Sequence, residues 1–392
     1  MPAAPSSPID PAIGQLLAAA RALGRNGAGI LPLLAAFPDT RARRGVRHRV
    51  AVILGLAVCA VLAGARSFVA IAEWAADADQ ATLDGLGVTG AVPSESTFRR
   101  VLQSLDADAL DDAADAWAQQ RTAPARGGRR LVAVDGKTLR GSGTAGEPGR
   151  HLLAALDHAR GVVLGQVDVQ AKTNEIPLFA TLLDRIDLAG AVVTADAMHA
   201  QRGHAEYLAG QRRADYLITV KRNQPGLHAQ LAGLPWRQIP AADIQRDRGH
   251  GRAERRSLKV TAVAAGIAFP HAAQAIQVAR RRRPLNGKNS RKWSTETVYA
   301  VTSLTVTQAS PAQLADFLRG HWSIEDSLHW VRDVTLGEDS SQIRTRNGPR
   351  VMASLRNLAI TILRLTGHAC IAAALRHHAR RPSRPLQTIT HC

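Results

Sequence analysis

Residues 131–142 read LVAVDGKTLRGS, and the interpretation of the whole chain starts from this stretch. Its apolar, β-branched beginning is typical of a buried strand. The strand delivers one carboxylate, Asp135, which is followed by Gly136 and Lys137. Burying a carboxylate costs several kcal/mol unless a cation or hydrogen bonds compensate. We therefore expect Asp135 either to take part in a local polar network or to hold a metal ion.

The segments that follow this stretch alternate between strand and helix patterns. Three strands are expected first, and the order β-β-β-α-β-α-β is typical of a ribonuclease H-like mixed sheet. In that arrangement the first and fourth strands are neighbours, so Asp135 and Asp196 would lie side by side. The further strands are expected at 151–159, 161–170, 191–198 and 215–221, and the helices at 175–186 and 201–213.

A β-rich insertion is expected at about 225–308, where strand-like segments interrupt the scheme. A dense basic loop is predicted inside it. Such a run is either a solvated surface or an arm that contacts DNA phosphates. Its members are Arg280, Arg281, Arg282, Arg283, Lys288, Arg291 and Lys292.

The N-terminal part of the chain has the pattern of small helices. Residues 1–29 are rich in Ala, Pro and Gly and are expected to be loosely ordered. A helical domain at 30–125 follows, with one helix at 93–106 that Ser94 or Ser96 can cap. Arg99 and Arg100 near the start of that helix are compatible with a DNA-reading bundle, although an ordinary solvated helix face explains them equally well.

The charge and composition of the chain indicate which class of molecule it binds. The chain has 50 Lys and Arg against 32 Asp and Glu, a formal net charge of +18. This excess favours a polyanion, with nucleic acid ahead of an acidic membrane surface. The apolar stretch 50–65 is shorter than the ~20 residues that cross a bilayer, so it predicts a buried core helix and no membrane association. Three scattered cysteines and no signal-peptide pattern favour the cytoplasm.

A long helix is expected to start at Ser310-Pro311, with serine as N-cap and proline in the first turn. His321, Glu325, His329 and Arg332 are spaced three or four residues apart, so we expect them to share one helix face. A last helix is predicted at about 349–365. The segment 369–392 that follows is expected to be a basic tail that is frayed from His377 onward.

Three carboxylates therefore stand out: Asp135, Asp196 and Glu325. Hard divalent cations such as Mg²⁺ prefer oxygen ligands. Two such ions about 4 Å apart can activate an attacking oxygen and stabilise a leaving one at a phosphodiester. The alternatives are ordinary ones. Each aspartate could cap a turn, and Glu325 could pair with Arg332 on a helix surface.

Six sequence words occur in a fixed order: VAVDGKTLRGS, AKTNEIP, TADAMHAQ, VKRNQP, HGRAERR and RGHWSIEDSLHWVRDVTLGED. Together they resemble the DDE transposases of bacterial insertion sequences, in the group that includes the H-repeat-associated proteins. The resemblance extends from about Phe37 to Leu365. It includes GARSFVAIAEW and SESTFRRVL, which resemble the associated N-terminal domain of that group.

The resemblance implies a metal-binding triad of Asp135, Asp196 and Glu325 in a ribonuclease H-like catalytic domain at 126–368, preceded by a DNA-binding domain. It implies two Mg²⁺ or Mn²⁺ ions, and cleavage and strand transfer at the ends of an element. The partners would be terminal inverted repeats and target DNA, bound by a homodimer in the assembled complex. A cytoplasmic, nucleoid-associated location follows.

Further side chains are candidates for DNA contacts, although each has an ordinary reading as a turn lysine, a plain loop or a core residue. Trp322 could stack on an unpaired base, which is worth ~1–3 kcal/mol. Related transposases often carry Tyr, Arg and Lys around the glutamate. Here Leu318 and His321 precede Glu325, and only Arg332 keeps the expected charge. The candidates are Lys137, Lys221, Arg222, Asn223, Gln224, His321, Trp322 and Arg332.

Two other functions stay open from the sequence. One is a nuclease on the same core that hydrolyses DNA without joining it. The other is an inactive, DNA-binding remnant of an element.

Overall fold

The computed structural model describes residues 29–392, apart from residues 40, 42–43, 45, 124–127, 170–172, 250, 264–266 and 287–291. The segment expected to be loosely ordered, 1–29, lies outside the described residues except for Gly29. The chain divides into two compact units. The first comprises Met1–Ala123, Gly136–Ile186 and Glu325–Cys392, and the second comprises Pro124–Asp135 and Asp187–Ile324.

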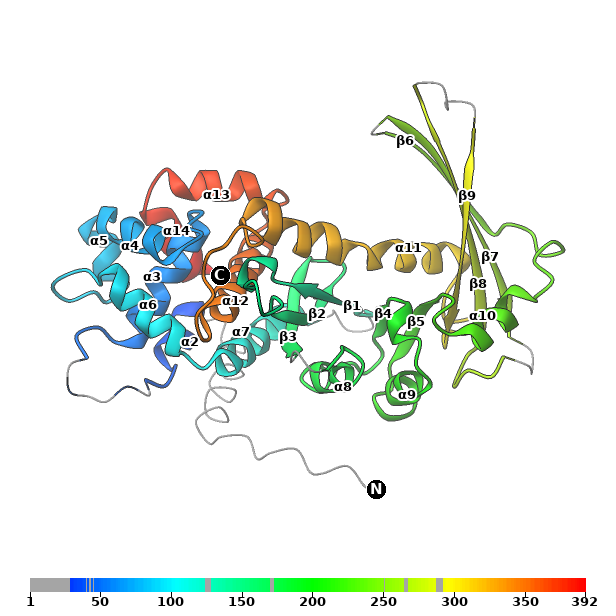
Figure 1. The fold of residues 1–392 in the computed structure, drawn as a ribbon, viewed down its shortest axis with the longest axis horizontal. Helices are drawn as coiled ribbons and strands as arrows, with labels where there is room; N and C mark the ends of the chain where they lie inside the picture. The colour runs from blue at the N-terminus through cyan, green and yellow to red at the C-terminus, as the bar shows by residue number, and fades with distance from the viewer. Residues whose placement is uncertain are drawn as a thin grey trace. The chain divides into compact units, whose positions relative to one another are not determined.

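Among the described residues, nine strands form one mixed sheet in the order β3-β2-β1-β4-β5-β9-β8-β7-β6 (Figure 1). The predicted ribonuclease H-like order is confirmed, because β1 pairs in parallel with β4 and β4 pairs in parallel with β5. The strands are β1 Leu131–Thr138, β2 His151–Asp157, β3 Val162–Val169, β4 Val192–Ala195, β5 Asp215–Val220, β6 Asp243–Gly249, β7 Arg252–Ala262, β8 Gln274–Pro284 and β9 Ser294–Thr302.

The insertion continues this sheet. After helix α10 (Pro225–Ala232), strands β6 to β9 form antiparallel pairs, and β9 returns to pair with β5. The prediction that Arg280 to Arg283 lie in a loop is wrong, since they lie on β8 between β7 and β9. The backbone of Arg280 to Arg282 is paired on both sides and that of Arg283 with β7, while their long side chains can still reach water. Lys288 and Arg291 lie outside the described residues.

Helices dominate the first unit, and α3 (Val50–Leu62) is at their centre. Its residues are apolar and almost all buried, because α2, α4, α6, α12, α13 and α14 contact it. The expectation of a buried core helix is confirmed, and no described helix has the length and apolar character to cross a bilayer. Other helices of the first unit, not all of them in contact with α3, are α2 Ile30–Ala35, α4 Phe68–Asp77, α5 Gln80–Gly85, α6 Glu95–Ser104, α7 Ala107–Arg121, α8 Leu178–Leu183 and α12 Gly348–Leu365.

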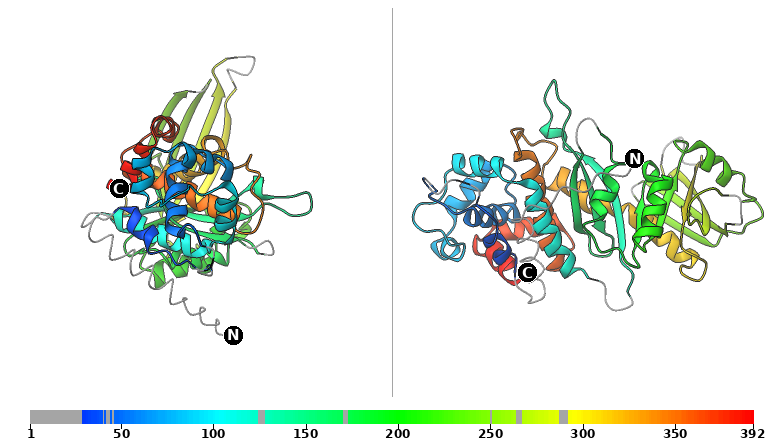
Figure 2. Two further views of the ribbon diagram at one scale, coloured as in Figure 1. Left: turned by 90° about the vertical axis from the view of Figure 1, so that its left-hand side faces the viewer. Right: turned by 90° about the horizontal axis from the view of Figure 1, so that it is seen from below.

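The C-terminal segment is helical, so the prediction of a frayed basic tail is wrong. It forms α13 (Ile371–Ala379) and α14 (Ser383–His391), which pack against the N-terminal helices. Figure 2 shows these red helices beside the blue ones. Ile371, Leu375 and Ile389 are buried there. A few apolar side chains at helical spacing therefore outweigh the basic composition of the segment.

The helix predicted after Ser310 is present but shorter than expected. It is α11 (Pro311–His321), and Ser310 and Gln313 form a capping box at its start. Beyond Trp322 the chain makes two π-helical turns, η4 (Glu325–His329) and η5 (Val331–Thr335). The wider π turn changes which side chains share a face, so the expected common face does not extend to Arg332.

Candidate metal centre

Asp135 and Asp196 lie on adjacent parallel strands in the second unit, Asp135 within β1 and Asp196 directly after the end of β4. Val134 of β1 is paired with Ala195 of β4, so the two aspartates are the next residue along each strand direction. Neighbouring strands are about 4.8 Å apart. The Asp196 side chain accepts a hydrogen bond from the Met198 N–H at 2.9 Å and caps the 3-10 turn η2 (Ala197–His199). The alternative prediction that Asp196 caps a turn is therefore correct for one of the interactions of this side chain.

The loop after β5 lies beside that turn. The Asn223 side-chain amide donates to the Ala197 carbonyl at 2.6 Å. Lys221 and Arg222 of the same loop are exposed, and Gln224 is half-buried. Two cationic side chains are thus placed next to the chain segment that carries Asp196, where they can reach an anionic ligand.

Glu325 and His329 lie at the two ends of the π turn η4 in the first unit. The His329 Nδ1 atom is 3.5 Å from Glu325 Oε2. The His329 ring is buried whereas the Glu325 carboxylate is exposed. Burial lowers the pKa of His329, so the imidazole is neutral at pH 7. Neutral imidazole and carboxylate are both metal ligands.

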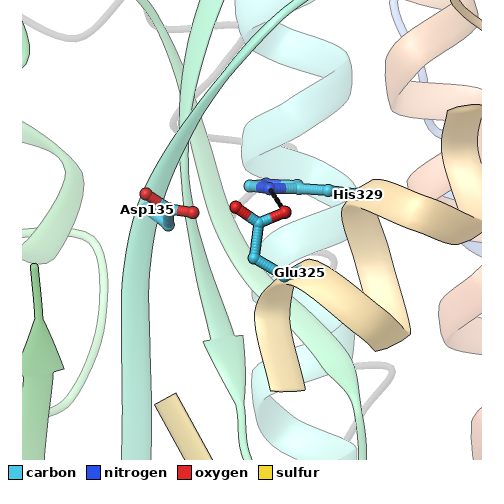
Figure 3. A group of neighbouring side chains, drawn as sticks. All are labelled: Asp135, Glu325 and His329. Carbon is cyan, nitrogen blue, oxygen red and sulfur yellow. Dashed lines mark ion pairs between the residues drawn. The ribbon is translucent and has the colours of Figure 1, made fainter. Parts of the chain in front are cut away.

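Figure 3 draws Glu325 and His329 of this π turn with their ion pair marked by a dashed line. Asp135, which the figure also labels, belongs to β1 and to the second unit. The sequence had indicated Glu325 but treated His329 as a polar contact. The only signal for His329 was its spacing of four residues from Glu325, which is also the spacing of ordinary helix-surface pairs.

Lys137 is buried, contrary to both sequence-based readings, which had its amine exposed to DNA or to water. Its Nζ atom forms an ion pair with Asp333 and lies 3.7 Å from Asp339. The Lys137 side chain is 8% exposed. Its charge is therefore compensated within the first unit, and we do not assign it a phosphate contact.

Arg332 is fully buried, at 0% exposure. Its Nε donates to Glu338 at 2.8 Å, and its Nη1 donates to Gln166 at 3.2 Å and Asn357 at 3.3 Å. This placement contradicts the predicted DNA contact, because a guanidinium with no exposed surface cannot reach a phosphate. The alternative prediction, an ion pair between Glu325 and Arg332, is also wrong, because the acidic partner of Arg332 is Glu338.

His321 and Trp322 end α11 in different environments. His321 is buried, and its Nδ1 lies 3.2 Å from the Thr194 hydroxyl of β4, so it supports the strand that leads to Asp196 and does not face DNA. Trp322 is 58% exposed, which rules out the reading as a core residue. Trp330, which the sequence did not single out, is 55% exposed. Exposed indoles of this kind can stack on bases.

A mixed sheet of this order, with one aspartate within β1 and another directly after the adjacent β4, defines a ribonuclease H-like protein with candidate metal ligands. Residues 126–362 match the family described as transposase DDE domain. Residues 31–118 match the family described as DDE_Tnp_1-associated. The chain therefore belongs to the DDE transposase family of bacterial insertion sequences.

Curated relatives match most of the chain. YncI of Escherichia coli O157:H7 is 30% identical over 86% of this chain and 87% of its own length. The H repeat-associated protein YhhI of Escherichia coli K12 is 29% identical over 88% of this chain and 92% of its own. Both are named as candidate transposases. A piggyBac transposase synaptic complex with hairpin DNA covers 95% of this chain at 12% identity and a TM-score of 0.41, a likeness too low to support an inference.

Proposed function

We propose that this chain binds the ends of an insertion element and catalyses metal-dependent DNA strand cleavage and strand transfer. The observation that supports this most is the parallel pairing of β1 with β4, which makes Asp135 and Asp196 the next residues after the paired Val134 and Ala195, within one unit. The third expected ligand is Glu325, which lies within the residues that match the DDE transposase family.

In this proposal Asp135, Asp196 and Glu325 hold two divalent cations, Mg²⁺ or Mn²⁺. The donor set fits such ions, because carboxylate oxygens are the ligands that hard cations prefer. When bound, the ions supply Lewis acidity to the attacking and leaving oxygens of a phosphodiester. Exposure of the Glu325 carboxylate leaves it open to ligand.

Other side chains of the chain have roles in positioning DNA. Lys221 and Arg222 contact phosphates near the turn that begins at Asp196, while Asn223 holds their loop to that turn. Gln224 extends this contact surface. Trp322 stacks on an unpaired base, in agreement with its exposure.

The remaining parts of the proposal concern the domains and partners. The helical region 30–125 binds element-end DNA, residues 126–368 form the catalytic domain, and two copies act together because an element has two ends. The site of action is the bacterial nucleoid, where the terminal inverted repeats and the target DNA are located.

A joining assay tests the function. The full chain is incubated with Mg²⁺, a labelled DNA end that carries the inverted repeat, and a supercoiled plasmid. Covalent transfer of the label to the plasmid is expected, and Asp135→Ala and Asp196→Ala should abolish it. Asp187→Ala, at an exposed turn, is the matched control and should join normally. Cleavage without joining would instead identify a nuclease, and DNA binding without cleavage would identify an inactive remnant.

A further inference from the structure

We propose that His329 is a nitrogen ligand of the ion held by Glu325, so that the metal centre combines carboxylate oxygens with one imidazole. This inference rests on the proposed function, since it requires Glu325 to bind metal. It adds a ligand that the carboxylate triad of the proposed function does not contain.

The first support is the separation of the two side chains. His329 Nδ1 and Glu325 Oε2 are 3.5 Å apart (Figure 3). Two ligands at neighbouring corners of an octahedron with bonds of about 2.1 Å lie roughly 3 Å apart. The observed separation is close to this value, so a small movement of the exposed carboxylate would let both atoms bind one ion.

The second support is the way in which the backbone presents the two groups. Glu325 and His329 are the first and last residues of η4, a π turn whose hydrogen bonds join residues five apart. Residues four apart therefore stay on the same side of the turn. π turns are rare, and they occur frequently at functional sites. A second π turn, η5, follows at once.

The third support is that the imidazole is held in place. The His329 side chain is 5% exposed. The turn that follows, η5, is held in place by Arg332. This side chain is hydrogen-bonded to Glu338, to Gln166 of β3 and to Asn357 of α12. A ligand that is already ordered loses little conformational entropy when an ion binds. The exposed Glu325 is the mobile member of the pair and His329 is the fixed one.

A simpler role for His329 would be to orient Glu325 by a hydrogen bond without touching the ion. The two roles differ in a property that can be measured. A directly bound imidazole places a nitrogen on the metal and shifts the preference of the site from Mg²⁺ towards transition metals that favour nitrogen ligands. An orienting imidazole places no nitrogen on the metal.

Pulsed electron paramagnetic resonance of the full chain loaded with Mn²⁺ distinguishes them. The wild-type protein should show nitrogen hyperfine coupling to the manganese, and selective ¹⁵N labelling of histidine should change that coupling. The coupling should disappear in His329→Gln and His329→Ala. His378→Gln is the matched control. His378 is also buried, but its two ring nitrogens interact with Ala374 and Thr388.

Each outcome decides a different question. Mn²⁺ bound without nitrogen coupling, or coupling that survives in both His329 variants, overturns the ligand role and leaves the proposed function standing. If wild type fails to bind Mn²⁺, or Glu325→Ala and Asp135→Ala bind it as tightly as wild type, the proposed function itself fails. Circular dichroism checks the fold of every variant. If the variants unfold, the labelled wild type still shows whether a histidine nitrogen is bound to the metal; absence of that coupling overturns the proposal, and its presence supports His329, the histidine paired with Glu325.

Discussion

Gly136, next to Asp135, has no room for a side chain. An ideal Cβ at this residue would lie 2.2 Å from Glu175 Oε1 and 2.6 Å from His151 Nε2. These two groups are hydrogen-bonded to each other at 2.8 Å, and His151 Nδ1 also lies 2.8 Å from the Thr138 hydroxyl. The space that a side chain would fill is therefore taken by a polar cluster that supports β1 directly after Asp135.

Gly136→Ala should destabilise the protein and weaken DNA cleavage. Overpacking of this kind typically costs about 1–3 kcal/mol, and the resulting shift of β1 would displace Asp135. Urea denaturation and the joining assay measure the two effects. Gly146→Ala is the control, since a Cβ there meets nothing within 4 Å. Equal stability of the two variants would contradict this prediction, because it would show that the polar cluster around Glu175 can move to make room for the new methyl group.

Asp115 on α7 is a second residue whose substitution should change stability, because its carboxyl group is buried. Burial raises its pKa well above the usual value, and the nearby Asp111 and Asp112 raise it further. A carboxyl with a raised folded-state pKa contributes its full stability below the unfolded-state pKa, and this contribution is lost as the pH rises through the folded-state pKa. At neutral pH the Asp115 charge is therefore unfavourable to folding.

We expect Asp115→Asn to be more stable than wild type at pH 7, by about 1 kcal/mol or roughly 2–4 °C in the midpoint. The new side-chain oxygen can still accept the Gln166 N–H, which lies 3.2 Å from Asp115 Oδ2. The difference should shrink as the pH approaches 4, where the wild-type carboxyl is protonated. Thermal melts across this range provide the test. Asp108→Asn, which weakens an ion pair to Arg350, should not stabilise.

At the scale of elements, one buried ion cluster joins η5 to α12. Glu338 accepts from Arg332 Nε at 2.8 Å and from Arg356 Nη1 at 3.1 Å, and all three side chains are buried. Burial raises the pKa of Glu338, but the two guanidinium groups outweigh it, so the pKa lies below its usual value. The stability that this carboxylate contributes is present above the unfolded-state pKa of about 4.3.

Glu338→Gln should destabilise the protein by about 3–5 kcal/mol at pH 7, because it leaves two buried cations without their shared anion. Stability of the wild type should fall as the pH drops below about 4, and the variant should lose less over that range. Chemical denaturation at pH 7 and pH 3.5 measures both effects. Glu296→Gln, an exposed partner of Arg282, should change stability by less than about 1 kcal/mol.

The elements show what sequence patterns can and cannot predict. Strands β1 to β5 and their order were predictable, because buried β-branched runs such as residues 131–134 have a period that identifies them. The π turns were not, since they depend on packing after Trp322 and have no sequence period of their own. Helices α13 and α14 were missed because the basic residues at 376–384 dominated the interpretation of the whole segment.

The candidate site was predictable to a similar degree. Asp135 and Asp196 follow from strand order, and Glu325 follows from the resemblance of its sequence word to known transposases. The burial of Arg332 could not be foreseen, because its partners Gln166 and Asn357 are distant in sequence and belong to other elements. A lone basic residue beside an expected catalytic glutamate is normally taken to face the substrate.

At the scale of the whole molecule, the net charge of +18 makes DNA binding sensitive to salt. Affinity should fall steeply with salt, with a slope set by the number of phosphates contacted. Lys221→Ala and Arg222→Ala should each reduce that slope by about 0.9. Fluorescence anisotropy with labelled element ends measures it over a range of salt concentrations.

The control for this series is a cation that is already neutralised. Arg185 pairs with Asp112 and is predicted to make no DNA contact. Arg185→Gln should leave the slope unchanged. If the loop variants also left it unchanged, the phosphate contacts assigned to residues 221 and 222 would have to be withdrawn.

The first unit draws on the beginning, the middle and the last part of the chain, and α14 packs against α2, α3 and α5. During synthesis, α3 therefore emerges from the ribosome hundreds of residues before its partners α12, α13 and α14. A nascent or prematurely terminated chain would expose this very apolar helix to chaperones and proteases. Translation that stops before α14 should thus yield a degraded fragment and no partly active enzyme.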